Sequence, residues 1–254
     1  MENKRTGVYE WADKSFNIQI GCENDCRYCF ARYRSVTRFK QCPSNEAWKT
    51  PVINFDTVNK GCRTNYGVVM FPSTHDITSL NLSEYLCKLR KYLDAGNHVL
   101  IVSKPRFDCI RVIAEAYEDY KEQILFRFTI GSMDNEILKF WEPNAPSFDE
   151  RLGCLQYAYR HGYKTSVSCE PYLDPFVVYT YTARKPFLTD SFWIGKLRGW
   201  HQVRMDDVTP AQAVDFIEPL KAAQSDTVVK SMVRMLDGQP FIQWKDSIRE
   251  VMGL

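Results

Sequence analysis

Residues 21–30 read Gly21-Cys22-Glu23-Asn24-Asp25-Cys26-Arg27-Tyr28-Cys29-Phe30, and the rest of the chain is interpreted from this stretch. It places three cysteines within eight positions, with the spacing C-x3-C-x2-C. A short apolar run at residues 16–20 precedes it, as a strand would. Three thiolates so close together on a loop suit an iron–sulfur cluster, whose irons are bound by cysteine sulfur. A [4Fe-4S] cube held by three cysteines leaves one iron open for a small ligand.

Two other roles suit these cysteines less well. A structural zinc site usually has four ligands and often consists of paired C-x2-C units, whereas Cys42 stands alone and no His pair follows it. A disulfide would leave one of the three cysteines unpaired. The chain also shows no secretory signal pattern, so we expect a reducing, cytoplasmic compartment and favour the cluster.

The composition is that of a globular chain without a membrane span. At 254 residues it can form one α/β barrel-like domain, and no apolar run reaches the roughly 18 residues that a membrane helix needs. Its 33 Lys and Arg against 31 Asp and Glu give a net charge of +2, which alone does not indicate nucleic acid. Positive charge does gather near the cysteines, at Lys4, Arg5, Arg27, Arg32, Arg34, Arg38 and Lys40. Such a segment is either a solvated helix face or a rim that faces phosphate.

Strand-like and helix-like patterns alternate beyond the cysteine loop. We expect a first helix over residues 27–40, an irregular connection over 42–67, and further strands at 67–72, 98–103, 124–130, 165–169 and 191–194. An apolar stripe predicts a helix over 82–95. This order predicts an α/β fold, a partial (β/α)6 parallel barrel over residues 1–198 with the cluster loop at 22–29. Beyond Arg198 the pattern is wholly helical, so residues 199–254 are expected to be a helical C-terminal extension packed on the barrel.

The cysteine loop resembles the motif that defines radical S-adenosylmethionine (SAM) enzymes, with the aromatic Tyr28 just before the last cysteine. This resemblance implies that Cys22, Cys26 and Cys29 bind a [4Fe-4S] cluster and that SAM binds the open iron. It implies reductive cleavage of SAM to a 5′-deoxyadenosyl radical, which removes a hydrogen atom from a substrate. It also implies an electron donor such as flavodoxin or ferredoxin.

Over residues 14–198 the chain looks most like the spore photoproduct lyase-related branch of these enzymes. The supporting stretches are Ser103-Lys104, Glu142-Pro143-Asn144-Ala145-Pro146-Ser147, Glu170-Pro171 and Trp193-Ile194-Gly195-Lys196. The branch implies a nucleobase, nucleotide or nucleic-acid substrate, with the class of reaction left open. The alternatives are a peptide or small-metabolite substrate, because fold does not fix function, or a nucleic-acid-binding protein with a structural or redox-sensing cluster.

Residues at the carboxyl ends of parallel strands open onto one face, so they are candidates to contact SAM. By the resemblance, Ser73-Thr74-His75-Asp76 stands where the SAM amino group is usually bound, with Thr74 or His75 at the methionine moiety. Ser103 and Lys104 would then reach the ribose or carboxylate, and Tyr28 would pack on the adenine. Weaker candidates are Arg127, Ser132, Arg151 and Glu170.

The lyase donates a hydrogen atom from a cysteine at the end of its second strand, and the resemblance places Ser73 there. Because a serine hydroxyl is a far poorer hydrogen-atom donor than a thiol, photoproduct repair proper is not expected. Cys169 is a displaced candidate donor, although a lone cysteine is usually a small buried hydrophobic residue. Tyr172 is the next candidate.

Overall fold

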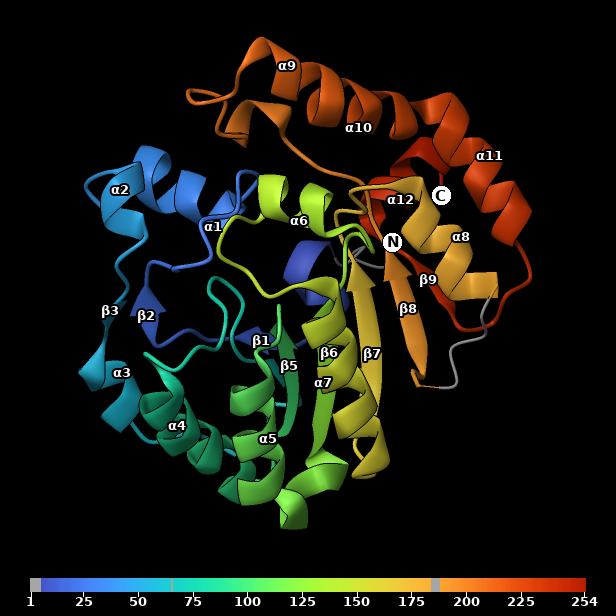
Figure 1. Cartoon of the computed structure of the whole chain (residues 1–254). Coiled ribbons are helices and arrows are strands. Elements are labelled where there is room, and N and C mark those ends of the chain that lie inside the picture. Colours follow the sequence, from blue (N-terminus) through green and yellow to red (C-terminus); the bar gives the residue numbers. More distant parts are fainter. Residues whose placement is uncertain (1–5, 65, 184–187) are drawn as a thin grey trace.

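The computed structural model describes residues 6–64, 66–183 and 188–254, so Lys4 and Arg5 of the basic segment lie outside the described residues. Its main sheet contains seven parallel strands that curve into a half-barrel (Figure 1). In sheet order they are β1 (Lys14–Ser15), β4 (Val68–Met70), β5 (His98–Ser103), β6 (Ile124–Thr129), β7 (Lys164–Cys169), β8 (Ser191–Ile194) and β9 (Ile242–Trp244). The predicted partial barrel is confirmed, with seven strands where about six were expected.

Helices cover the outer face of the sheet, and α4, α5 and α7 lie in front of it in Figure 1. The helices of the first part are α1 (Phe30–Tyr33), α2 (Asn45–Trp48), α3 (Phe55–Asn59), α4 (Leu82–Asp94), α5 (Phe107–Ala116), α6 (Asn135–Trp141), α7 (Phe148–Arg160) and α8 (Pro175–Ala183). Those of the last part are α9 (Pro210–Gln212), α10 (Glu218–Ala223), α11 (Asp226–Leu236) and α12 (Asp246–Met252). Shorter 3-10 and π turns are η1 (Gly7–Glu10), η2 (Arg34–Arg38), η3 (Glu118–Gln123), η4 (Trp200–Gln202) and η5 (Ala213–Ile217).

The two faces of the sheet bury different residues, because successive side chains of a strand point to opposite sides. On β6, Phe126 and Phe128 are fully buried in the main core under the helices. Leu125, on the other face, packs in a small cluster with Trp11 and Ala12. The N-terminal turn η1 and the residues after it therefore fill the hollow of the half-barrel.

The cysteine loop is held by a second, two-stranded sheet, in which β2 (Gln19–Ile20) pairs antiparallel with β3 (Val52–Ile53). Gly21 follows with φ +100°, and a Cβ there would lie 2.7 Å from the carbonyl oxygen of Trp48. Only glycine fits so close to that backbone. The connection over 42–67 is thus more regular than expected, and the helix expected over 27–40 begins at Phe30.

The residues beyond Arg198 are not wholly helical, which corrects the prediction for the C-terminal extension. Strand β9 pairs in parallel with β8, with Ile242 opposite Phe192, and so extends the sheet. Three residues are too few for a strand period to stand out between helices. Helices α9 to α11 pass over the top of the half-barrel (Figure 1), and the domain boundary at residue 198 stays a prediction. In the described ranges, no helix combines the length and the apolar character needed to cross a membrane.

Candidate cluster and cofactor site

The loop that carries the three cysteines lies between β2 and α1. Cys22 and Cys26 are buried, Cys29 is partly exposed, and all nine cysteines of the chain are free thiols. Cys29 caps α1, because its sulfur accepts the backbone N–H of Arg32 at 3.4 Å. The loop therefore presents its thiols from a fixed backbone, as a cluster site requires.

The chemistry of the three thiols fits a [4Fe-4S] cube. Burial raises the pKa of Cys22 to about 12, and it raises the pKa of Cys26 well above its ordinary value, against the opposing charge of Lys104. Among the described residues, no three His, Cys, Asp or Glu side chains converge on one metal ion. A cube does not require this, because each cysteine binds a different iron. Metal binding would hold the thiols as thiolates and release their protons.

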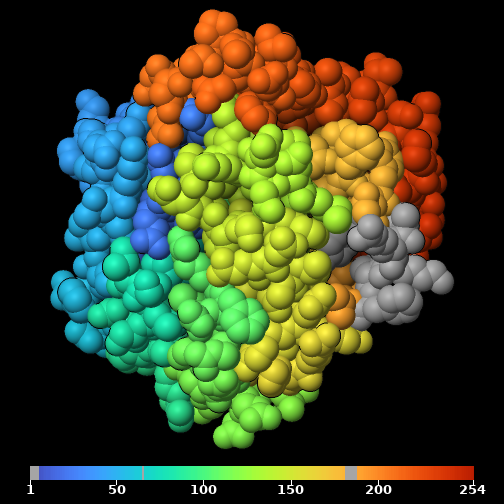
Figure 2. Space-filling view, in the orientation of Figure 1, coloured from blue at the N-terminus to red at the C-terminus, as the bar shows by residue number. Residues whose placement is uncertain are grey.

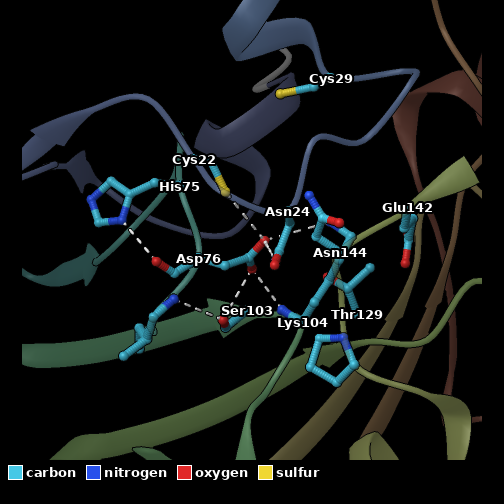
Figure 3. Close-up of polar contacts among 12 residues, drawn as sticks. Cys22, Asn24, Cys29, His75, Asp76, Ser103, Lys104, Thr129, Glu142 and Asn144 are labelled. Carbon is cyan, nitrogen blue, oxygen red and sulfur yellow. Dashed lines mark hydrogen bonds and ion pairs between the residues drawn. The ribbon is translucent and has the colours of Figure 1, made fainter. Parts of the chain in front are cut away.

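The carboxylate of Asp76 joins the cysteine loop to the ends of β4 and β5 (Figure 3). It accepts three hydrogen bonds, from the Asn24 amide at 2.8 Å, the Ser103 hydroxyl at 3.0 Å and the Lys104 backbone N–H at 2.6 Å. Lys104 Nζ lies 3.8 Å and Cys22 Sγ 4.0 Å from Oδ2 of the same group. Burial would raise the pKa of Asp76, but the Lys104 charge and these donors outweigh burial and lower it. Asp76 is therefore an ionised anchor beside the cysteines.

Lys104 also faces Tyr28 and a buried ion pair. Its Nζ lies 5.7 Å from the ring centre of Tyr28, whose hydroxyl donates a hydrogen bond to Glu142. Glu142 is paired with Arg151 at 2.5 Å, and both side chains are fully buried. Arg151 also donates to the carbonyl of Thr129 at 3.1 Å. The guanidinium predicted to touch SAM is thus occupied inside the protein, where it fixes Glu142.

His75 is buried, and both of its ring nitrogens have partners. Nδ1 lies 3.1 Å from the carbonyl oxygen of Asp76, and Nε2 accepts the backbone N–H of Ile18 at 3.4 Å. Burial lowers the pKa of His75 to about 4, so the imidazole is neutral. Thr74 lies beside it, is half-buried, and donates its backbone N–H to Asn17 at 2.9 Å. Of the two candidates for the methionine moiety, Thr74 has the more accessible side chain.

Ser73, which the resemblance places where the lyase has its cysteine, belongs to the same loop. Its hydroxyl lies 2.5 Å from that of Ser15 and accepts a hydrogen bond from the Asn17 amide at 3.0 Å. The structure thus brings the carboxyl ends of β4 and β5 together with Tyr28 of the cysteine loop. The predicted residues gathered there are Tyr28, Ser73, Thr74, His75, Asp76, Ser103 and Lys104.

Arg127 of β6, whose Nε donates to the Ser166 hydroxyl of β7 at 3.0 Å, and Glu170, which follows β7, lie elsewhere in the half-barrel. The Arg127 guanidinium carbon is 4.5 Å from the Trp11 ring centre and 5.0 Å from that of Trp193, and burial lowers its pKa to about 9. Glu170 lies 3.5 Å from Lys245 Nζ, and burial raises its pKa to about 7 despite that cation. The two residues form a second polar group rather than part of the Asp76 group.

Three further candidates have packed or paired positions. Ser132 is fully buried, and its hydroxyl donates a hydrogen bond to the Asp174 carboxylate. Cys169 is fully buried in the main core, on the face of β7 that packs against the helices. The Tyr172 hydroxyl donates to the carbonyl oxygen of Ala223 at 3.0 Å. The roles of Cys169 and Tyr172 as hydrogen-atom donors stay predictions.

A segment from the C-terminal part of the chain covers the cysteine loop. Arg204 pairs with Asp25 at 2.5 Å, and both side chains are nearly buried. The Arg204 backbone N–H also donates to the carbonyl of Arg27 at 2.9 Å, and the Arg27 side chain pairs with Asp207. These contacts hold the loop between Cys22 and Cys29 from outside the barrel.

Sequence reasoning missed Asn24, Glu142 and Arg204 as site residues. Asn24 lies inside the cysteine loop, and Glu142 lies in a stretch that carries the family resemblance. The position of each in the sequence could therefore have marked it as a site residue. Arg204 had no such signal, because its partner Asp25 lies 179 residues away in the sequence.

Comparison of the sequence with known proteins finds a partial relative. No protein-family model matches the chain. It is 28% identical over 176 residues to "Uncharacterized protein ORF301" of Acidianus two-tailed virus; the alignment covers 65% of this chain and 56% of that protein. The chain therefore spans little more than half the length of this relative.

Two solved structures of spore photoproduct lyase are similar at the level of the fold. One is complexed with dinucleoside spore photoproduct and superposes with TM-score 0.53 and 14% identity, covering 89% of this chain and 74% of the lyase. The other is a mutant with bound AdoMet and dinucleoside spore photoproduct. It superposes with TM-score 0.53 and 14% identity, covering 91% of this chain and 75% of the lyase. The chain has the half-barrel fold of spore photoproduct lyase, a radical SAM enzyme, which confirms the fold that the resemblance implied.

Proposed function

We propose that this chain is a radical SAM enzyme whose Cys22, Cys26 and Cys29 bind a [4Fe-4S] cluster. The observation that carries the proposal is the position of three free thiols beside the Asp76–Lys104 pair, in a fold shared with spore photoproduct lyase. When bound there, the cluster and SAM would supply radical chemistry that starts from reductive cleavage of SAM and removes a hydrogen atom from the substrate.

The chain's own residues orient the bound SAM. Lys104 offers a cation to the SAM carboxylate, and Asp76 holds Lys104 and the cysteine loop in register. The half-buried Thr74 lies in the same loop as Asp76, after β4. We place this reaction in the cytoplasm, with an electron donor such as flavodoxin or ferredoxin.

The proposed substrate is a nucleobase, nucleotide or nucleic acid. The structurally similar lyase is complexed with a dinucleoside, and the segment after the cysteine loop is basic. Ser73 in the place of a donor cysteine argues against photoproduct repair proper. A peptide or small metabolite is the second candidate, because the half-barrel hosts many reactions.

Isotope transfer tests both the activity and the substrate class. The reconstituted protein is incubated without oxygen with SAM, a reductant, and deuterated oligonucleotides, nucleosides or peptides in parallel. We expect mass spectrometry to find deuterium in 5′-deoxyadenosine from the nucleic-acid substrates. Deuterium from peptides alone would contradict the substrate class, and intact SAM in every reaction would favour a structural or redox-sensing cluster.

A further inference from the structure

Residues 27–40 contain four arginines and one lysine but no acidic residue, and the structure divides these cations into two sets. Arg27 and Arg32 are buried. Arg27 Nε donates to the carbonyl of Phe140 at 2.8 Å, and Arg32 donates to the Asn45 side chain at 2.8 Å. These two arginines hold the cysteine loop and are not available to a partner.

Arg34, Arg38 and Lys40 form the second set, on η2 and just after it, and all three are exposed. In the described part of the chain, none of them has a carboxylate within 4.0 Å. Among the other described arginines that are exposed, Arg90 and Arg198 are paired with acids, whereas Arg63, Arg160 and Arg234 are not. Arg34, Arg38 and Lys40 differ from the latter in lying together on one short segment.

Two aromatic rings are exposed on the same short segment. Phe30 is 45% exposed and Phe39 is 49% exposed. The guanidinium carbons of Arg34 and Arg38 lie 5.2 and 5.5 Å from the Phe39 ring centre, so the cations and this ring share one surface. We name the set Phe30, Arg34, Arg38, Phe39 and Lys40 the 30–40 surface.

The 30–40 surface adjoins the cluster loop, because α1 begins at Phe30, directly after Cys29. In Figure 1, α1 lies beside α2 at the end of the molecule that the C-terminal helices cover. Figure 2 shows the chain around residues 25–50, in blue, at the molecular surface next to the orange C-terminal segment. A long ligand held on this surface could thus extend toward the cysteines.

We infer that the 30–40 surface binds single-stranded nucleic acid and guides it to the cluster site. Unpaired cations attract the phosphate backbone, and exposed rings stack on bases, which is how sequence-tolerant single-strand binding works. Bases in a duplex are stacked inside it and cannot reach Phe30 or Phe39. An acidic protein would use the cations but would not need the rings. The inference rests on the proposed function only in taking this nucleic acid to be the substrate.

Fluorescence anisotropy with a labelled 15-nucleotide single strand, using the full chain with its reconstituted cluster, tests the inference. Each phosphate contact contributes about 0.7 to the slope of log affinity against log salt for single strands. We therefore expect Arg34→Ala/Arg38→Ala to weaken binding and to lower the slope by about 1.4. Phe39→Ala should weaken binding by roughly 5- to 160-fold at an unchanged slope, because it removes stacking and no charge.

The chain offers a matched control on α7. Tyr159 is 47% exposed and Arg160 beside it is exposed, at the end of a helix that precedes the amino end of β7, far from the cluster loop. Tyr159→Ala/Arg160→Ala removes an exposed ring together with an exposed cation at this distant place, and we expect it to bind the single strand with wild-type affinity. Equal iron content in all variants shows that the changes act on the surface.

Three results would overturn the inference. The first is that Arg34→Ala/Arg38→Ala binds the single strand with wild-type affinity, and the second is that the wild type binds duplex as tightly as single strand. The third is that Arg34→Ala/Arg38→Ala no longer binds an acidic flavodoxin but keeps its affinity for the oligonucleotide. The last result would assign the surface to a protein partner. Failure of the proposed function is seen separately, as intact SAM in a protein that still binds the single strand through this surface.

Discussion

At the scale of the residue, Lys104 is the side chain that we expect to contact SAM most directly. Lys104→Met removes the charge and keeps the length, so we expect SAM binding to weaken by about 10-fold or more, since a hydrogen bond to a charged group contributes about 1.5–3 kcal/mol. Iron content should not change. Calorimetric titration of the reconstituted protein with SAM measures this effect, and Lys139→Met, at an exposed lysine of α6, is the control. Unchanged SAM affinity, or loss of iron, would contradict the role.

Glu170 predicts a pH dependence of stability. Its side chain is 25% exposed, and burial raises its pKa from 4.5 to about 7. Between these values the folded state binds more protons than the unfolded state, so the free energy of unfolding falls as the pH rises. Across this pH range, the titration of Glu170 lowers the free energy of unfolding by about 3 kcal/mol. Glu170→Gln removes it, so urea denaturation at pH 4.5 and 8 should show wild type losing more stability than the variant; parallel losses would refute the assignment.

At the scale of the element, the segment after η4 is expected to keep the cluster in place. Arg204→Ala leaves the buried Asp25 carboxylate without its main partner, which typically costs about 3–5 kcal/mol. We therefore expect faster loss of iron to a chelator and a lower melting temperature. Arg204→Ala/Asp25→Asn removes both charges and should recover part of both losses. If Arg204→Ala releases iron at the wild-type rate, the segment does not hold the loop.

Elements with a strong local pattern could be predicted from the sequence, and elements fixed by distant contacts could not. The strands at 98–103 and 191–194 and the helix over 82–95 have regular apolar periods, and they match β5, β8 and α4 within a residue. Strand β9 has three residues, and its place is set by pairing with β8. The same division holds in the site: the cysteine loop has a motif, whereas the contact of Arg204 with it depends on the completed fold.

At the scale of the whole molecule, both ends of the described chain support the half-barrel. Turn η1 fills the hollow, and its Gly7 N–H donates to Asp246 of α12 at 3.0 Å. The segment that contains Arg204 covers the cysteine loop. The parallel sheet between them collects its polar side chains at the carboxyl ends of the strands, which explains why residues at the ends of β4 and β5 meet beside Cys22.

The central claim is that three cysteines, and no others, hold a cluster that cleaves SAM. Cys42 provides a matched control, because it is buried in the same small apolar cluster as Cys22. The measurement is iron content together with 5′-deoxyadenosine formation after anaerobic reconstitution. We predict about four irons per chain and SAM cleavage for wild type and Cys42→Ala. Cys22→Ala, Cys26→Ala and Cys29→Ala should each lose SAM cleavage, and any of these three that kept full iron content and cleavage would contradict the account.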